Sequence, residues 1–296
     1  MTRVLVTGGT GFVGRFIVEH LLASGYDVVV GGRSPPAPTL FSKPVAFVAL
    51  TLDPDIDQSP ALRHVDHFVH AAFQHVEGRY RGGEGGDPEG FRRSNLDGSA
   101  SLFRTARDQG IKRCVFLSSR AVYGKQPPGA DLFEETPCHP DSLYGALKLE
   151  AENELAKLNT EGFKTVSLRV TGVYGAPGSG GAHKWQPLFD DYLSGRVIAP
   201  RAGTEVHGDD VAAAVRLVLE TPSDRPPDGV LNVSDILVDN RAILALVRDI
   251  TGSPHTLPGP AVLTAFNTMN TEKIRALGWQ PGGLKRLQAS LTSLLA

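Results

Sequence analysis

The sequence predicts an α/β fold, a doubly wound parallel sheet with helices on both faces. Short apolar runs, many of them β-branched, alternate with longer segments of helical periodicity. The runs are hydrophobic throughout, which is typical of strands buried on both faces, and the first leads through several glycines directly into a helical segment. The 296 residues, 41% of them hydrophobic and 21% charged, are enough for one large domain or two smaller ones.

The predicted strands share a continuous apolar stretch, and the predicted helices share apolar residues at helical spacing or a composition rich in helix formers. The predicted strands are residues 4–6, 28–30, 45–50, 65–70, 113–117, 165–170 and 230–233. The predicted helices are residues 12–22, 96–108, 143–158, 187–194, 211–220 and 241–251. Strands that alternate with helices of this length indicate a parallel sheet.

Three glycines between the first strand and the first helix form a candidate phosphate-binding turn. Gly8, Gly11 and Gly14 have the spacing G-x-x-G-x-x-G. The first glycine allows a sharp turn, the second lets the backbone approach a pyrophosphate, and the third lets helix and strand pack closely. Free N–H groups and the helix macrodipole favour the anion. The strand–turn–helix context predicts a dinucleotide site that includes Phe12 and Val13, rather than a simple tight turn.

The regular alternation of strands and helices ends near residue 174. We therefore expect a Rossmann-like dinucleotide-binding domain in residues 1–174 and a smaller substrate-binding region in residues 175–296, with some segments of the second returning to the first. The glycine-rich residues 78–90 are expected to form a long surface loop or a lid after the fourth strand.

The tip of the second strand bears on the choice of cofactor. A carboxylate at this tip selects NAD by accepting hydrogen bonds from the adenosine ribose diol. Here the tip is Gly31-Gly32-Arg33-Ser34 and holds no carboxylate. Arg33 can pair with a ribose 2′-phosphate and Ser34 can add a hydroxyl group, which favours NADP. The alternative, an Arg33 that only faces solvent, leaves NAD possible.

A tyrosine and a lysine provide a candidate acid/base pair. Tyr144 and Lys148 are four residues apart on a predicted helix and therefore share one face. A free phenol has a pKa near 10, and a neighbouring ammonium lowers that value, so the pair can act as a general acid/base near neutrality. Ser119 follows the strand of residues 113–117, at the edge where open α/β sheets bind ligands, and its hydroxyl can bond to a reacting oxygen.

The motifs together resemble a known enzyme family. Residues 7–14 (TGGTGFVG), 118–124 (SSRAVYG) and 144–148 (YGALK) are similar to those of extended short-chain dehydrogenase/reductases, and more narrowly of the NAD-dependent epimerase/dehydratase family. Further stretches resemble the same family at residues 70–72, 95–98, 169–175, 207–212 and 277–281. The resemblance spans nearly the whole chain and identifies the superfamily rather than one substrate.

The resemblance implies a role for each matching residue. Tyr144 is the acid/base, Lys148 lowers its pKa and holds the nicotinamide ribose, and Ser119 orients the substrate carbonyl or hydroxyl. Asn95 supports the active-site lysine. The stretch that lines the cofactor includes Ala71 and Ala72. The cofactor supplies the redox chemistry, and the protein supplies positioning and proton transfer.

The sequence departs from the family beside the catalytic serine. Family 4,6-dehydratases carry Thr-Asp-Glu here, whereas this chain has Ser119-Arg120-Ala121, so the acid and base for water elimination are missing. Arg120 stands where the family has a small residue. It either reaches an anionic group of the substrate or turns outward.

A second departure concerns the diphosphate of nucleotide sugars. Sugar-nucleotide epimerases usually place an arginine four residues before the late histidine, whereas this chain has Gly203 there and Arg201 as the nearest cation. This weakens the case for a nucleoside-diphosphate sugar, although Arg201, Lys184 or Arg196 can substitute. The candidate substrate contacts are Arg120, His75 and Arg201.

Three functions remain open at this point. The first is an NAD(P)-dependent oxidoreductase that transfers a hydride between the nicotinamide and a hydroxyl or carbonyl of a sugar-like small molecule. The second is a nucleotide-sugar 4-epimerase with tightly bound NAD. The third is a non-catalytic dinucleotide sensor, which the presence of both Tyr144 and Lys148 disfavours.

Composition excludes several other classes. A net charge of −2 disfavours a nucleic-acid binder, and no apolar run approaches the ~20 residues that cross a bilayer. With only Cys114 and Cys138 and no signal-peptide pattern, we expect a reducing, cytoplasmic location. His67 and His70 point to opposite faces of a strand, so we expect no metal site there. By analogy with the family, a homodimer would form through residues 96–108 and 143–158.

Overall fold

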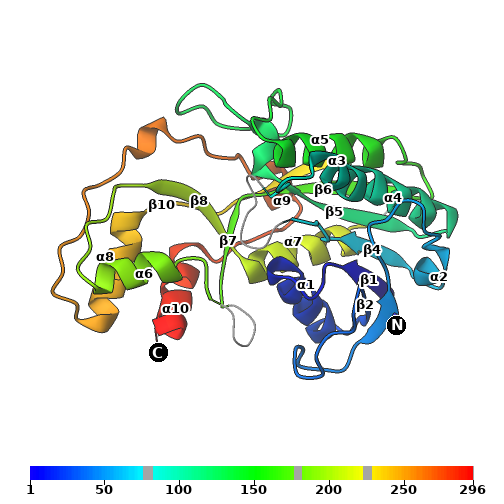
Figure 1. Cartoon of the computed structure of the whole chain (residues 1–296), viewed down its shortest axis with the longest axis horizontal. Helices are drawn as coiled ribbons and strands as arrows, with labels where there is room; N and C mark the ends of the chain where they lie inside the picture. Colours follow the sequence, from blue (N-terminus) through cyan, green and yellow to red (C-terminus); the bar gives the residue numbers. More distant parts are fainter. Residues whose placement is uncertain (76–82, 177–181, 223–228, 296) are drawn as a thin grey trace.

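The computed structural model describes residues 1–75, 83–176, 182–222 and 229–295. Its main element is a seven-stranded sheet in the order β3-β2-β1-β4-β5-β6-β9, in which every pairing is parallel. In chain order these strands are β1 (Arg3–Thr7), β2 (Asp27–Gly32), β3 (Ala46–Ala49), β4 (His67–His70), β5 (Arg113–Ser119), β6 (Lys164–Val170) and β9 (Gly229–Val233). The predicted α/β, Rossmann-like doubly wound sheet is confirmed (Figure 1).

Helices cover both faces of this sheet. On one face lie α1 (Phe12–Ala23) and α7 (Gly208–Glu220), and on the other lie α4 (Ser99–Asp108) and α5 (Leu143–Ala156) (Figure 1). Successive side chains of β1 point to opposite faces of the sheet, so the hydrophobic core has two halves. Val4 packs with α1 and α7, and Leu5 packs with α4 and α5. Among the described residues no helix is both long and apolar enough to span a membrane.

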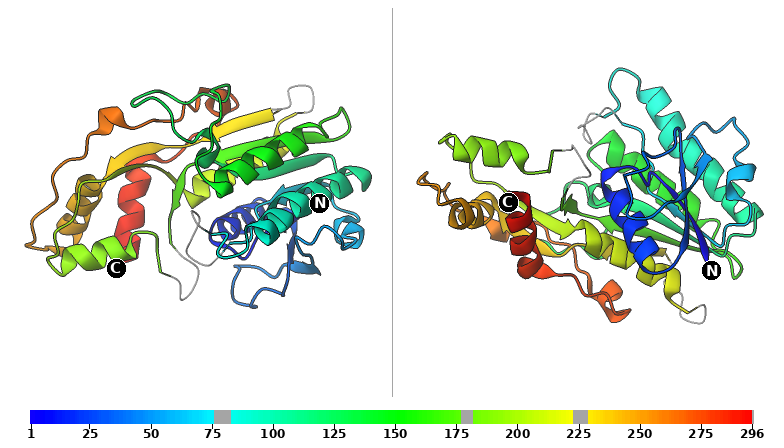
Figure 2. Two further views of the ribbon diagram at one scale, coloured as in Figure 1. Left: turned by 45° about the horizontal axis from the view of Figure 1, so that its top comes forward. Right: turned by 90° about the horizontal axis from the view of Figure 1, so that it is seen from below.

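The remaining elements form a smaller lobe around a three-stranded sheet in the order β10-β8-β7. Its strands are β7 (Gly172–Tyr174), β8 (Ala202–His207) and β10 (Ile236–Asp239), and its helices are α6 (Gln186–Leu193), α8 (Asn240–Thr251) and α10 (Gly283–Leu295). The views in Figure 2 agree that these three helices gather at one end of the molecule. They enclose a separate apolar core that includes Trp185, Phe189 and Leu244.

Two segments of the second half of the chain lie within the main sheet layer. β9 pairs with β6 from Val166↔Gly229 to Val170↔Val233. Helix α7 packs on α1 so closely that a Cβ atom at Gly208 would meet the ring of Phe16. Short helical elements include α2 (Ser59–Leu62), α9 (Glu272–Ala276) and the 3-10 turns Arg120–Tyr123 and Leu263–Ala265.

The structure corrects the prediction for the segment before α4. The predicted helix of residues 96–108 starts earlier, because α3 (Pro88–Arg92) and a π-helical turn (Arg93–Gly98) run directly into α4. Pro88 suits a first helical turn, and Oδ1 of Asp87 accepts a hydrogen bond from the Gly90 N–H at 2.9 Å. The predicted loop of residues 78–90 is therefore helical at its end, whereas residues 78–82 lie outside the described part of the chain.

Strands β7, β8 and β10 were not predicted. Their residues include Gly172, Gly203, Thr204 and Glu205, which break the apolar pattern that marks the other strands. The predicted connections at residues 175–181 and 222–229 lie mostly outside the described residues.

Candidate active site

The glycine turn brings together the residues predicted to hold the dinucleotide. Gly8 has a φ of +70°, and a Cβ atom there would lie 2.6 Å from the Ala72 N atom. A Cβ atom at Gly14 would fall on the Gly8 carbonyl oxygen. The turn and residues 71–72 therefore touch, backbone against backbone, which only glycine permits.

The start of α1 is left open, unlike the starts of several other helices. The cap residue Gly11 offers no side-chain hydrogen bond. In contrast, Ser142 caps α5 and Asp239 caps α8 through their side-chain oxygens. The first turn of α1, which includes Phe12 and Val13, thus presents backbone N–H groups to an external acceptor. This arrangement fits the pyrophosphate of a dinucleotide.

Arg33 and Ser34 lie just beyond the end of β2 and are exposed to solvent. Their side chains are therefore accessible to a ligand that extends over this edge of the sheet from the glycine turn.

The catalytic candidates converge at the carboxyl end of β5. The Nζ atom of Lys148 donates to the carbonyl oxygen of Leu117 at 2.7 Å, two residues before Ser119. Gly145, the neighbour of Tyr144, packs so closely on the backbone of Ala121 that a Cβ atom would lie 2.5 Å from its carbonyl oxygen. The two helix residues and Ser119 therefore lie at one strand end, as the sequence predicts.

Lys148 is almost completely enclosed, with 4% of its surface exposed. Burial lowers the pKa of its ammonium from 10.5 to about 7, and the carboxylate of Glu152 opposes this shift. The aromatic rings of Phe73 and Phe116 lie beside the ammonium, with centroids 4.5 and 4.6 Å from Nζ. A desolvated ammonium with a lowered pKa, enclosed by aromatic rings at a strand end, is typical of a functional site.

Asn95 is buried in the π-helical turn and holds the loop that follows β4. Its Oδ1 atom accepts from the Gln74 N–H at 2.6 Å, and its Nδ2 atom donates to the carbonyl oxygens of Gln74 at 2.8 Å and Phe91 at 3.0 Å. The structure thus places Asn95 beside the segment that leads from Ala71 and Ala72 towards Lys148.

Sequence reasoning placed His70 in the family-like stretch of residues 70–72 and expected no metal site there, but it missed that the His70 ring links three segments of the site. Its Nδ1 atom lies 2.7 Å from Thr7 Oγ1, and its Nε2 atom lies 2.9 Å from Ser99 Oγ. Ser99 donates its own proton to the Asn95 carbonyl oxygen at 2.6 Å, so it accepts from His70 Nε2–H, and Thr7 donates to Nδ1. Complete burial lowers the pKa of His70 to about 3 and keeps the ring neutral.

A buried ion pair behind the serines was also missed. Arg169 donates to the Glu152 carboxylate at 2.8–3.2 Å, and the Ser118 hydroxyl donates to the same carboxylate. Because Glu152 lies one helical turn after Lys148 and Ser118 precedes Ser119, the pair braces α5 against the end of β5. The sequence offers two signals for it, the spacing of four residues from Lys148 to Glu152 and the place of Arg169 at the start of the family-like stretch 169–175.

The candidate substrate residues lie apart from one another. Arg120 donates to the Asn267 carbonyl oxygen at 2.9 Å and covers the ring of Phe266 at 5.2 Å. His75 lines a hollow of about 270 Å³ near Glu84. Arg201 is exposed, immediately before β8.

A second charged pair occupies the edge near Gly203. Lys184 forms an ion pair with Glu205, which is buried in β8 opposite Gly172 of β7. A Cβ atom at Gly172 would lie 2.5 Å from Lys184 Nζ, so the glycine makes room for the pair. Burial raises the pKa of Glu205, and Lys184 and Arg201 oppose the shift. β7 begins two residues beyond Val170, which pairs with Ser119, so this carboxylate lies near the catalytic edge.

The late motif of residues 207–212 has a packing role. His207 packs on Phe16 and Tyr174. The Asp210 carbonyl oxygen accepts a hydrogen bond from the Trp279 indole at 2.8 Å. Among the described residues no cluster of three or more His, Cys, Asp or Glu side chains has the geometry of a metal site.

Fold and site together define a dinucleotide-dependent enzyme with a Tyr–Lys pair and a serine at a strand end. A model of the NAD-dependent epimerase/dehydratase family matches residues 4–234. The chain belongs to this family, and it is accordingly an enzyme of the short-chain dehydrogenase/reductase superfamily that uses a nicotinamide dinucleotide.

Individual relatives differ in the reaction that their names give. A UDP-glucose 4-epimerase of Streptomyces lividans is 30% identical over 320 residues, which cover 94% of this chain and 91% of that protein. A dihydroquinoline-1-oxide ketoreductase of Stigmatella aurantiaca is 31% identical over 180 residues, which cover 59% of this chain and 51% of that protein. The structure of a Thermus thermophilus UDP-glucose 4-epimerase in complex with NAD superposes with a TM-score of 0.79 at 28% identity, covering 99% of both chains.

Proposed function

We propose that this protein is an NAD(P)-dependent oxidoreductase that transfers one hydride, with net redox change, between the nicotinamide and a hydroxyl or carbonyl group of a sugar-like small molecule. The observation that carries the proposal is the convergence of Tyr144, Lys148 and Ser119 at the end of β5, on the same sheet edge as the open glycine turn.

Each residue has a distinct task in this reaction. Ser119 holds the reacting oxygen of the substrate by a hydrogen bond. The Tyr144 hydroxyl gives a proton to that oxygen during reduction and takes it back during oxidation. The Lys148 ammonium stabilises the phenolate that forms. The bound dinucleotide supplies or accepts the hydride at its nicotinamide ring.

A negative charge near Gly203 favours net redox chemistry over the epimerisation of a nucleotide sugar. Gly203 stands where sugar-nucleotide epimerases usually have the arginine that binds the diphosphate. Its neighbour on the strand is the buried carboxylate of Glu205. A diphosphate placed there would meet a negative charge that Lys184, and more weakly Arg201, offset. A substrate without a diphosphate avoids this repulsion.

The test is the absorbance of the reduced cofactor at 340 nm with a panel of sugar-like carbonyl compounds. We expect stoichiometric loss of NADPH in the wild type. Tyr144→Phe should lose the catalysed reaction and keep the dinucleotide affinity. Full turnover by this variant would refute the mechanism.

A second candidate is a nucleotide-sugar 4-epimerase. The similarity to UDP-glucose 4-epimerases over 94% of the chain favours it. In this reaction the bound NAD takes a hydride from the sugar, is thereby reduced, and is reoxidised when it returns the hydride within the same cycle, so no net absorbance change occurs. Native mass spectrometry that finds retained NAD, together with interconversion of UDP-glucose and UDP-galactose, would establish this function in place of the first.

We also propose that NADP is the preferred cofactor, on the basis of the exposed Arg33 and Ser34 at the tip of β2. A 2′-phosphate can accept hydrogen bonds from the Arg33 guanidinium. Equal dissociation constants for NADPH and NADH would contradict the proposal.

We also propose that the protein forms a homodimer and that it is located in the cytoplasm. A homodimer through α4 and α5 would join faces that carry both cations, Arg104 and Lys157, and carboxylates, Asp97 and Glu154, so attraction between opposite charges should make its association weaken with salt. Sedimentation at low and high ionic strength tests this. A reducing, cytoplasmic location agrees with two free cysteines, of which Cys114 is buried.

A further inference from the structure

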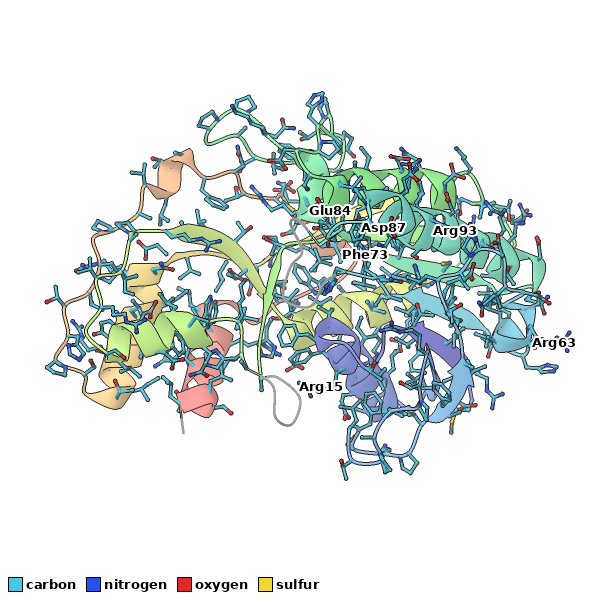
Figure 3. The ribbon with its side chains drawn as sticks, in the orientation of Figure 1. Arg15, Arg63, Phe73, Glu84, Asp87 and Arg93 are labelled. Carbon is cyan, nitrogen blue, oxygen red and sulfur yellow. The ribbon has the colours of Figure 1, made fainter. Side chains whose placement is uncertain are left out.

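Phe73 touches both catalytic side chains of the helix at once. Its ring centroid lies 5.0 Å from that of Tyr144, edge to face, and 4.5 Å from the Lys148 Nζ atom. It directly follows Ala71 and Ala72, which pack against the glycine turn. Figure 3 labels Phe73 near Asp87, on the side of the main sheet that faces the smaller lobe. Phe73 therefore stands between the cofactor turn and the acid/base pair.

Phe73 is one wall of an aromatic enclosure around the lysine. Phe116 of β5 forms the opposite wall at 4.6 Å from Nζ, and the Leu117 carbonyl oxygen accepts the hydrogen bond at 2.7 Å. The rings exclude water from an ammonium whose hydrogen bond goes to the Leu117 carbonyl oxygen. Their negative faces attract the cation, and this attraction is strongest where water is absent.

The charged groups around Lys148 stabilise its ammonium only weakly, so the aromatic rings contribute to keeping it charged. Glu152 of α5 favours the ammonium, but its carboxylate is already bonded to Arg169 of β6. His70 of β4 is neutral, and the Lys148 charge disfavours its protonation. Tyr144 is uncharged except when it has given up its proton. Desolvation of the ammonium is therefore opposed by the Leu117 carbonyl oxygen, by the shared Glu152 carboxylate and by the two aromatic faces.

We propose that Phe73 is a positioning residue for hydride transfer, whose ring, together with that of Phe116, holds the Lys148 ammonium in its charged form against the Tyr144 ring. The predicted change in the hydride-transfer rate rests on the proposed function. The predicted shift of the Lys148 pKa does not, because the rings surround the ammonium even when no substrate is bound. An aliphatic residue in place of Phe73 would still exclude water from the ammonium but would not provide the cation–π attraction that stabilises its charge.

The first measurement follows the lysine itself. In protein labelled with ¹³C-lysine, the Lys148 Cε signal, assigned with Lys148→Arg, gives the midpoint of its titration. Phe73→Leu should lower this midpoint by about one pH unit, since a desolvated cation–π contact is worth about that much. Phe73→Tyr, which keeps the π face, should restore the wild-type midpoint.

Phe91→Leu is the matched control. Phe91 lies edge to face against Phe73 at 5.4 Å and is a buried member of the apolar cluster against which Phe73 packs, while Lys148 Nζ lies beside the rings of Phe73, Phe116 and Tyr144. The control should leave the lysine midpoint unchanged. An unchanged midpoint in Phe73→Leu, or an equal shift in both leucine variants, would overturn the proposal.

The second measurement is the rate of single-turnover hydride transfer against pH. In Phe73→Leu the alkaline limb should move to lower pH by the same amount as the lysine midpoint. The rate on that limb should fall about tenfold, while the rate at acidic pH is kept. A uniform loss at all pH values indicates a merely structural effect and overturns the role. If the wild type transfers no hydride to any compound, the proposed function is refuted. The lysine titration then still tests whether Phe73 keeps the Lys148 ammonium charged.

Discussion

The buried pair of Glu152 and Arg169 allows a quantitative test of how the site is braced. Their side chains are 4% and 6% exposed, and three N–O contacts of 2.8–3.2 Å join them. Glu152→Ala leaves an arginine charge buried without its partner, which typically costs about 3–5 kcal/mol. The double variant Glu152→Leu/Arg169→Met removes both charges of the pair and should lose less, because no arginine charge remains buried without a partner. Both variants take the same carboxylate away from Lys148.

The assay is urea unfolding of the wild type, the single variant and the double variant, followed by tryptophan fluorescence. Linear extrapolation gives the free energies of unfolding, and equal slopes show that the same surface is exposed in each case. The exposed pair of Arg216 and Glu220 on α7 serves as control, and Glu220→Ala should cost less than about 1 kcal/mol. The reasoning is refuted if Glu152→Ala is no less stable than the double variant.

Three further predictions concern the cofactor turn and pH. Gly14→Ala should abolish dinucleotide binding in calorimetry, because its Cβ atom would overlap the Gly8 carbonyl oxygen. Arg33→Ala should weaken NADPH binding at least tenfold and leave NADH binding nearly unchanged, and equal losses would contradict the phosphate contact. The pKa of His70 is lowered from 6.5 to about 3, so its stabilising effect is complete above pH 6.5 and is lost as pH falls towards 3. Unfolding between pH 6.5 and 5 should show a loss of about 2 kcal/mol, which His70→Gln reduces.

The sequence predicted those features that depend on local pattern. The spacing of Gly8, Gly11 and Gly14 predicts the turn because the steric demand lies within a few residues. Tyr144 and Lys148 share a helix face for the same reason, and the structure brings both to the end of β5.

The features that sequence reasoning missed depend on contacts between distant residues. Strand β8 escaped prediction because Glu205 is polar, and its burial depends on Lys184, 21 residues away. The link from Thr7 through His70 to Ser99 joins three elements whose meeting no local periodicity reveals. The role of Phe73 was missed for the same reason. A single phenylalanine after a strand indicates no function until the structure shows which side chains it contacts.

The return of β9 and α7 to the main sheet has a consequence for biosynthesis. A nascent chain that ends near residue 174 has β6 as a bare edge, with unpaired N–H and C=O groups, until Val233 has left the ribosome. The ring of Phe16 likewise stays uncovered until Gly208 arrives. A chain truncated after residue 174 therefore exposes an edge and a ring that the complete chain covers, and we expect it to self-associate through this edge.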